Sequence, residues 1–284
     1  MIKSGQFYPK KIKKSIVTLF MCLLIVIMVF PFYIIFTNSF KTLRQFYESP
    51  ITLPKELFLG NYQYVVENLP YFRGLLNNFI VLIGSLILIL AFGSMAGFII
   101  ARRPSRVKKA LYSFFVLGIT LPTFTMLIPQ VKLIGDLGLK NNYLALVLLY
   151  CASGMPTSLF LFTGFFSSVP ADFEDAAKID GCSLGKMYTK IYFPISKATC
   201  STVIMLQTIG IWNDTVMPDL IMTNDKFKTL MPSLQTFYGR MLGQGTRWDY
   251  IYAFVVLCVI PIIIMYAIVN KYLIQGVIEG ALKG

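Results

Sequence analysis

Long apolar runs separated by short charged segments dominate the pattern of this chain. Between consecutive charged residues, five uncharged tracts hold 21 to 31 residues each, and a sixth holds 16. A helix needs about 20 apolar residues to cross a bilayer core of ~30 Å, so five tracts suffice, and the sixth qualifies if its polar end lies inside a bundle. The pattern predicts an all-α integral membrane protein with six transmembrane helices. These predicted spans lie at about 15–36, 75–101, 110–131, 143–166, 198–221 and 250–270.

Composition supports a membrane protein with a single domain. Of the 284 residues, 56% are apolar and only 14% are charged, whereas soluble domains carry roughly 25% charged residues. The segments between the predicted spans are too short and too scattered to build a second hydrophobic core. We therefore expect residues 1–284 to form one transmembrane domain.

The net charge of +13 is distributed along the chain and forms no single patch. If the amino terminus is cytoplasmic, the inside segments hold 16 of the 26 basic residues, although the outside loops are longer in total. This bias follows the positive-inside rule and places both termini in the cytoplasm. The basic excess thus sets orientation and gives no reason to expect a nucleic-acid partner. Contact between anionic membrane lipids and the 102–109 turn is a secondary effect.

The titratable residues do not suggest catalysis or a metal site. The chain has no histidine, which is the commonest general base and metal ligand in proteins. Its five cysteines contain no C-x-x-C pair, and none lies in a predicted outside loop. We expect no catalytic residue, no metal site and no cofactor bound by this chain, and a membrane-embedded enzyme is disfavoured.

Polar residues gather at the end of the fifth predicted span. Asp214 follows Trp212 there, and a carboxylate at membrane depth usually faces a bundle interior or a water-filled cavity. Alternatively, the span ends at Trp212 as an interfacial residue, with Asp214 in water. Asn77, Asn78 and Ser153, in other spans, either line the same cavity or hydrogen-bond one helix to another.

The 167–197 loop, predicted to be cytoplasmic, carries the most informative pattern. Acidic residues follow Pro170 at a position typical of a helix amino terminus, where the helix dipole favours anions. Gly181 interrupts the periodicity and Ser183 can cap a second helix. We expect a short helix, a break and an amphipathic helix that ends at Pro194. The first helix either fills a groove on a partner protein or lies on the membrane surface.

The same loop carries a family resemblance. Asp175-Ala176-Ala177, three residues, Gly181, nine residues and then Ile191-Tyr192-Phe193-Pro194 match E-A-A-x3-G-x9-I-x-L-P in both spacings. This pattern marks the membrane subunits of binding-protein-dependent ABC importers. Aspartate replaces the glutamate and Phe193 replaces the leucine. Further matches extend to Lys283-Gly284, and the chain resembles the carbohydrate-uptake branch, within it the maltose-type second permease.

The resemblance implies a multi-pass subunit in the cytoplasmic membrane of a bacterium or archaeon. It implies a heterodimer with a second homologous permease, two ATP-binding subunits and an extracytoplasmic sugar-binding protein. The sequence has no G-x-x-x-x-G-K-[ST] phosphate loop, so ATP and magnesium are expected on the partner ATPase. The first loop helix would then be a coupling helix. The residues expected to dock it on the ATPase are Glu174, Asp175, Ala176, Ala177, Asp180 and Gly181, with Glu174 and Asp180 as charged partners of basic residues.

The expected function is to form half of the path for a sugar or oligosaccharide. Amide and carboxylate groups beside an aromatic ring suit a ligand that combines hydroxyls with apolar ring faces. The alternative function is a secondary transporter or channel for a small polar solute, although intramembrane charge suited to ion coupling is sparse. The candidate residues for the substrate path are Gln207, Trp212, Asn213, Asp214, Thr123 and Ser153.

Overall fold

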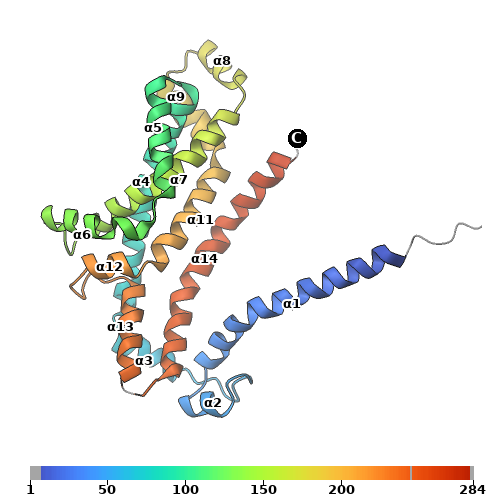
Figure 1. The fold of residues 1–284 in the computed structure, drawn as a ribbon, viewed down its shortest axis with the longest axis vertical. Coiled ribbons are helices and arrows are strands. Elements are labelled where there is room, and N and C mark those ends of the chain that lie inside the picture. The colour runs from blue at the N-terminus through green and yellow to red at the C-terminus, as the bar shows by residue number, and fades with distance from the viewer. Residues whose placement is uncertain (1–7, 244, 282–284) are drawn as a thin grey trace, which may run out of the picture. The chain divides into compact units, whose positions relative to one another are not determined.

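The computed structural model describes the backbone of residues 8–243 and 245–281, and the side chains of 14–122, 124–243 and 245–271. Within these ranges all regular elements are helices or helical turns, and none is a strand (Figure 1). The chain divides into two compact units. The first comprises Met1–Leu69 and Phe237–Leu257, and the second comprises Pro70–Thr236 and Cys258–Gly284.

In the first unit, the segment that follows the first long helix folds around a buried lysine, Lys41. The side chain of Lys41 is 1% exposed, and its Nζ donates to the carbonyl of Ser49 at 2.8 Å. Asn61 Nδ2 donates to the carbonyls of Ser39 and Lys41, so side-chain bonds satisfy the backbone where the helix stops. The helices of this unit are α1 (Tyr8–Ser39), α2 (Leu43–Glu48), α3 (Gly60–Asn68), the end of α13 (Leu230–Gly243) and the start of α14 (Trp248–Ala281).

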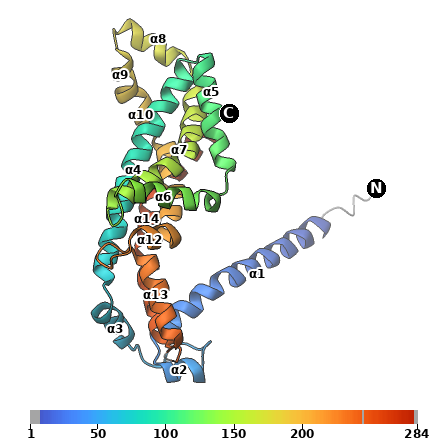
Figure 2. The same cartoon turned by 60° about the vertical axis from the view of Figure 1, so that its left-hand side comes forward.

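The second unit is built on the close pair α4 (Tyr71–Arg102) and α7 (Tyr143–Ser168), which lie side by side in Figures 1 and 2. A Cβ added to Gly97 would lie 2.7 Å from Cβ of Phe162. Small residues let membrane helices approach closely enough for van der Waals contact, which drives their association. This unit also holds the start of α13 and α14 from Cys258 onward. Its other α-helices are α5 (Arg106–Leu117), α6 (Leu127–Asp136), α8 (Asp172–Ile179), α9 (Leu184–Met187), α10 (Phe193–Ile195), α11 (Lys197–Asn213) and α12 (Val216–Ile221).

Four of the predicted spans are confirmed as long apolar helices. In the part of the chain that the structure describes, the helices long and apolar enough to cross a membrane are Lys14–Ser39, Tyr71–Arg102, Tyr143–Ser168 and Trp248–Lys271. They coincide with the predicted first, second, fourth and sixth spans. The chain is therefore a multi-pass membrane protein.

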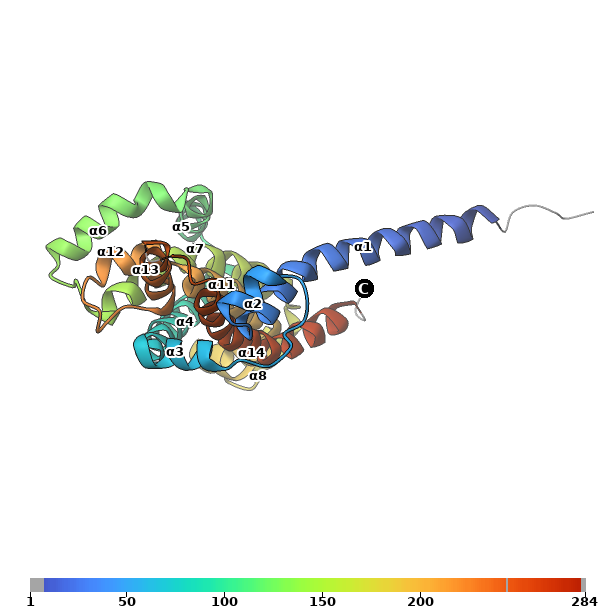
Figure 3. The same ribbon diagram turned by 90° about the horizontal axis from the view of Figure 1, so that it is seen from below.

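The third predicted span, 110–131, is not one straight helix. Arg106–Thr120 and Phe124–Asp136 meet at an angle of 99°, so that α6 runs sideways from α5 (Figures 1 and 3). Pro122 lies at the break, where its ring and missing N–H prevent a helix from continuing. Counted as one bent span, this pair brings the number of candidate spans among the described residues to five.

The fifth predicted span, 198–221, is split into α11 and α12. The 17-residue α11 ends at Asn213, one residue after Trp212. Asp214 Oδ1 then accepts hydrogen bonds from the amides of Val216 and Met217, at 2.9 and 3.2 Å. A side chain that takes these amides competes with continued helix. The count of six spans stays a prediction.

Asn77 and Asn78 connect α4 to the segment before α13. Asn77 Nδ2 donates to the carbonyls of Lys226 and Lys228 at 3.0 and 2.8 Å. The amide of Leu230 donates to Asn78 Oδ1 at 3.1 Å. Of the two alternatives for these amides, the structure supports the hydrogen-bonded connection between segments.

Candidate functional site

The predicted pattern of the 167–197 loop is confirmed as a helix, a break and a second helical stretch. Helix α8 has Asp172, Glu174 and Asp175 in its first turn, where carboxylates stabilise the helix dipole. Gly181 follows it with a φ of 69°, a left-handed conformation that favours glycine. Ser183 Oγ then accepts from the amide of Lys186 and caps α9. From α9 the path continues through a π-helical turn, Tyr188–Tyr192, and α10.

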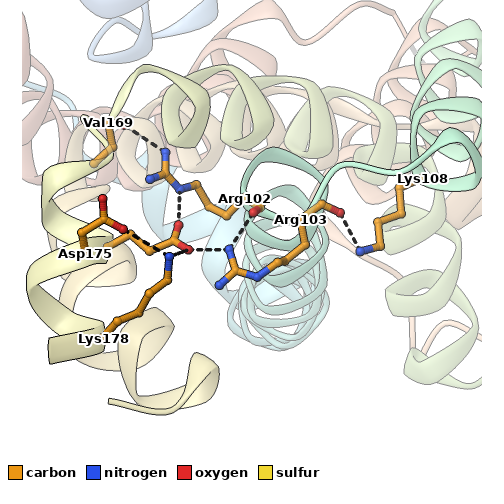
Figure 4. Close-up of polar contacts among 7 residues, drawn as sticks. Arg102, Arg103, Lys108, Val169, Asp175 and Lys178 are labelled. Carbon is orange, nitrogen blue, oxygen red and sulfur yellow. Dashed lines mark hydrogen bonds and ion pairs between the residues drawn. The ribbon is translucent and has the colours of Figure 1, made fainter. Parts of the chain in front are cut away.

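Glu174 is buried on the inner side of α8 and forms ion pairs with three basic residues, Arg102, Arg103 and Lys178. Figure 4 labels these three partners. The Glu174 carboxylate accepts from Arg103 Nη1 at 2.6 Å and from Arg102 Nε at 3.1 Å. Lys178 Nζ lies 3.1 Å from the same carboxylate. Only 9% of the Glu174 side chain and 10% of the Arg102 side chain are exposed. The buried carboxylate is thus satisfied within the chain.

These ion pairs keep Glu174 ionised. Burial by itself raises the pKa of this carboxyl, but hydrogen bonds from Lys178, Arg103 and Arg102 outweigh burial and leave the pKa below its ordinary value. The hydrogen bond to Glu174 raises the pKa of Lys178 in turn. Both groups therefore carry their charges at neutral pH.

The outer side of α8 is exposed and partly apolar. Phe173 is 50% exposed and Ile179 is 87% exposed. The six predicted docking residues divide between the two sides. Glu174 and Ala177 are buried on the inner side, whereas Asp175, Ala176, Asp180 and Gly181 are exposed.

The position of Glu174 corrects one sequence-based expectation. Its carboxylate was expected to meet basic residues of an ATPase, but it binds Arg102 and Arg103 of its own chain. The reason is helix geometry, because neighbouring helical residues project about 100° apart, so that Glu174 points inward while Asp175 is exposed on the outer side. Sequence reasoning missed this role of the two arginines, since the positive-inside rule already accounted for their charge.

A second candidate site is a pocket of about 460 Å³ between α6, α7, α11 and α12. Among the predicted path residues, Ser153, Gln207, Asn213 and Asp214 all line it, so the structure brings these four together. Gln130 and Tyr150 add further polar groups beside apolar walls such as Leu149 and Ile211. Hydroxyl, amide and carboxylate groups on an apolar surface suit a small polar ligand.

Asp214 has structural bonds within this pocket. Besides accepting from the amides of Val216 and Met217 through Oδ1, it accepts a hydrogen bond from the hydroxyl of Tyr150 at 2.8 Å through Oδ2. Asn213 Nδ2 donates back to the carbonyl of Ile209 at 2.9 Å. Tyr150 was missed by sequence reasoning, although its position one helical turn before Ser153 in the same tract was a signal that could have found it.

Of the predicted path residues that the structure describes, Trp212 does not line the pocket. Trp212 is 1% exposed, and its Nε1 donates to the carbonyl of Cys258 at 3.2 Å. Its ring packs against Phe79 with the centroids 5.5 Å apart. The side chain of Thr123 lies outside the described residues. In this structure Trp212 is therefore packed inside the bundle, and its ring is not open to the pocket.

Comparison with known proteins places this arrangement in a family. Residues 90–279 match the model of the family described as "Binding-protein-dependent transport system inner membrane component". The match covers more than half of the chain, which therefore belongs to this family of transport permease subunits. The resemblance found in the 167–197 loop is confirmed.

The chain is similar over its length to curated members of the family. It is 29% identical over 275 residues to the probable starch degradation products transport system permease protein AmyC of Thermoanaerobacterium thermosulfurigenes, covering 96% of this chain and 98% of AmyC. It is 28% identical over 255 residues to the melibiose/raffinose/stachyose import permease protein MelC of Bacillus subtilis, covering 89% of this chain and 91% of MelC.

A solved structure shares the fold. It is a chain in the crystal structure of a bacterial ABC transporter involved in the import of the acidic polysaccharide alginate. The TM-score is 0.82 at 19% identity, and the match covers 95% of this chain and 99% of that chain.

Proposed function

We propose that this chain is the membrane-spanning subunit that forms half of the path for a sugar or oligosaccharide in an ATP-driven importer. Membership of the permease family supports transport, and the names of the relatives AmyC and MelC support a carbohydrate substrate. The chain would act in the cytoplasmic membrane with six spans and both termini inside. It would pair with a related second permease and receive its substrate from an extracytoplasmic binding protein.

One observation carries the proposed link to an ATPase: the outer side of α8 exposes large apolar side chains. Phe173 and Ile179 stand beside Ala176 and Gly181, which are small enough to admit a close partner. An exposed apolar surface rimmed by charges is typical of a protein interface. In this proposal α8 is the coupling helix, and Asp175 and Asp180 face basic residues of the ATPase.

Energy comes from the partner subunits in this scheme. The sequence contains no phosphate-binding loop, so ATP and Mg²⁺ bind two separate ATP-binding subunits, and this chain is not catalytic. Closure of the ATPase pair on ATP would move α8 and open the membrane path alternately to each side. The α6–α7–α11–α12 pocket, with Ser153, Gln207 and Asn213, is the part of the path proposed for this subunit.

Substitution of Gly181 tests the docking role of α8. Gly181→Trp should abolish ATP-driven uptake while the chain still inserts, because it strains a positive φ and adds bulk to the outer side. Gly185→Trp is the matched control, since an added side chain there also meets open space without a positive φ. Uptake is measured in proteoliposomes that hold the complex purified through a tag on this chain. Normal uptake by Gly181→Trp would contradict the proposal.

The same assay separates the proposal from its alternative. Labelled maltotriose and raffinose serve as probes, as sugars of the kinds named for AmyC and MelC. Uptake of either that needs ATP and a binding protein supports the importer. A secondary transporter would instead take up solute through this chain alone, without ATP.

A further inference from the structure

Arg102 joins four segments of the chain at one end of the second unit. It is the last residue of α4, and its Nη1 donates to the carbonyl of Val169, directly after α7, at 3.0 Å. Its Nε binds Glu174 of α8, and its guanidinium lies 5.2 Å from the ring centre of Tyr192. Figure 4 shows the first three of these segments converging on the Arg102 side chain.

The helices that Arg102 joins are themselves tightly connected. Gly97 packs against Phe162 where α4 meets α7. One turn away, Ser94 Oγ and the hydroxyl of Tyr188 are 2.6 Å apart, which links α4 to the second half of the loop. The ring of Phe98 packs against those of Tyr188 and Tyr192, with the ring centroids 5.4 and 4.9 Å apart. Close packing of this kind makes α4, α7 and the loop base move together.

Helix α8 has few other contacts that could hold it to this body. Of its eight residues, only Glu174 and Ala177 are buried. The break at Gly181 follows it, and an added Cβ there would meet nothing within 4 Å. The orientation of α8 therefore depends on the bonds of Glu174.

We propose that the Glu174 cluster, formed by Glu174, Arg102, Arg103 and Lys178, holds α8 rigidly to the α4–α7 pair and transmits movement of α8 to these helices. The inference rests on the proposed function, because it assumes that an ATPase moves α8. Glu174 is a positioning residue in this scheme. It acts through the arginines, while the neighbouring Asp175 faces the partner.

The arrangement predicts uncoupling when the cluster is broken. In Glu174→Gln the carboxylate charge is lost, but the outer side of α8 is unchanged, so the ATPase still binds. We expect binding-protein-stimulated ATP hydrolysis within about twofold of wild type and uptake of maltotriose or raffinose reduced at least about tenfold, the range of a typical coupling free energy. Asp172→Asn is the matched control, since it removes an exposed carboxylate from the same turn.

The outcomes of this assay are distinct. Wild-type uptake in Glu174→Gln overturns the inference. Loss of the ATPase subunits from the purified complex also overturns it, because Glu174 would then contribute to docking. If the wild-type complex shows no ATP-driven uptake, the proposed function fails, and the positioning role is decided by a measurement on the chain alone.

That measurement is the distance between two spin labels, introduced as Ile179→Cys in α8 and Val107→Cys in α5. Both positions are exposed, at 87% and 68%, and the five native cysteines are replaced beforehand. We expect a narrow distance distribution in wild type and in Asp172→Asn, and a broad one in Glu174→Gln and Arg102→Gln. An equally narrow distribution in Glu174→Gln overturns the inference.

Discussion

Adjacent carboxylates in α8 meet different environments. The side chain of Glu174 is 9% exposed and that of Asp175 is 67% exposed, although both bond Lys178. Removing one member of a buried ion pair leaves an uncompensated charge, whereas exposed pairs contribute little. Two residues that read alike in the sequence should therefore differ in their effect on the stability of the loop.

The pH dependence of α8 follows from the lowered pKa of Glu174. A carboxyl whose folded pKa lies below its ordinary 4.5 contributes stability above that pH, and the contribution is lost as pH falls through the folded pKa. We expect the distribution of spin-label distances between positions 179 and 107 to stay narrow from pH 7 to about 5 and to broaden in more acidic solution. Glu174→Gln should give a broad distribution at every pH. A wild-type distribution that narrows on acidification would contradict the claim that ionised Glu174 holds α8 in place.

The bond between Tyr150 and Asp214 gives a second prediction at this scale. Tyr150→Phe removes the donor to Asp214 Oδ2, and a hydrogen bond to a charged group contributes about 1.5–3 kcal/mol. We expect a lower apparent melting temperature in detergent. Tyr266→Phe is the control because Tyr266 is 51% exposed. Equal melting temperatures for the two variants would show that the bond adds no stability.

At the scale of elements, the shape of the second unit follows from where glycine and proline stand. Glycine allows α4 and α7 to touch, and Pro122 ends the straight path of α5. The apolar tracts predicted both regions as spans, because hydrophobicity reports burial in lipid and not helix continuity. The bend at Pro122 and the break at Asp214 come from backbone hydrogen bonding.

Substitution of Gly97 tests the contact between α4 and α7. In Gly97→Ala the new Cβ would lie 2.7 Å from Phe162 Cβ and 3.0 Å from the amide nitrogen of Thr163, so the helices must separate. Overpacking of this kind costs about 1–3 kcal/mol. Gly164→Ala in α7, which meets nothing within 4 Å, is the control. Thermal unfolding in detergent should show a lower melting temperature for Gly97→Ala and an unchanged one for Gly164→Ala. Equal melting temperatures for the two variants would contradict the close contact.

At the scale of the molecule, segments predicted on the same side of the membrane meet in the second unit. The 102–109 turn contacts the 167–197 loop through Arg102, Arg103 and Glu174. At the other end of the α4–α7 pair, Asn141 accepts from the amide of Asn224 at 2.8 Å, joining two predicted outside loops. The contacts agree with the alternation of sides that the charge bias predicts.

Cysteine labelling in intact cells tests this orientation. Asp225→Cys, in a loop predicted to be outside, should react nearly completely with a membrane-impermeant maleimide, since Asp225 is 88% exposed. Ile179→Cys should react only after the membrane is opened. Both variants are made without the native cysteines. The reverse pattern would place the termini outside.

The sequence by itself determined the class of protein, four of its spans, the helix–break–helix form of the 167–197 loop and its family. These features depend on apolar length, helix signals and motif spacing, which are local in the chain. The tertiary structure decided that Glu174 faces Arg102 and Arg103, that Trp212 packs away from the pocket and that Tyr150 bonds Asp214. Those partners lie 46 to 72 positions apart. Only the packing of helices brings such residues together, because hydrophobic periodicity reports burial but does not identify the residues in contact.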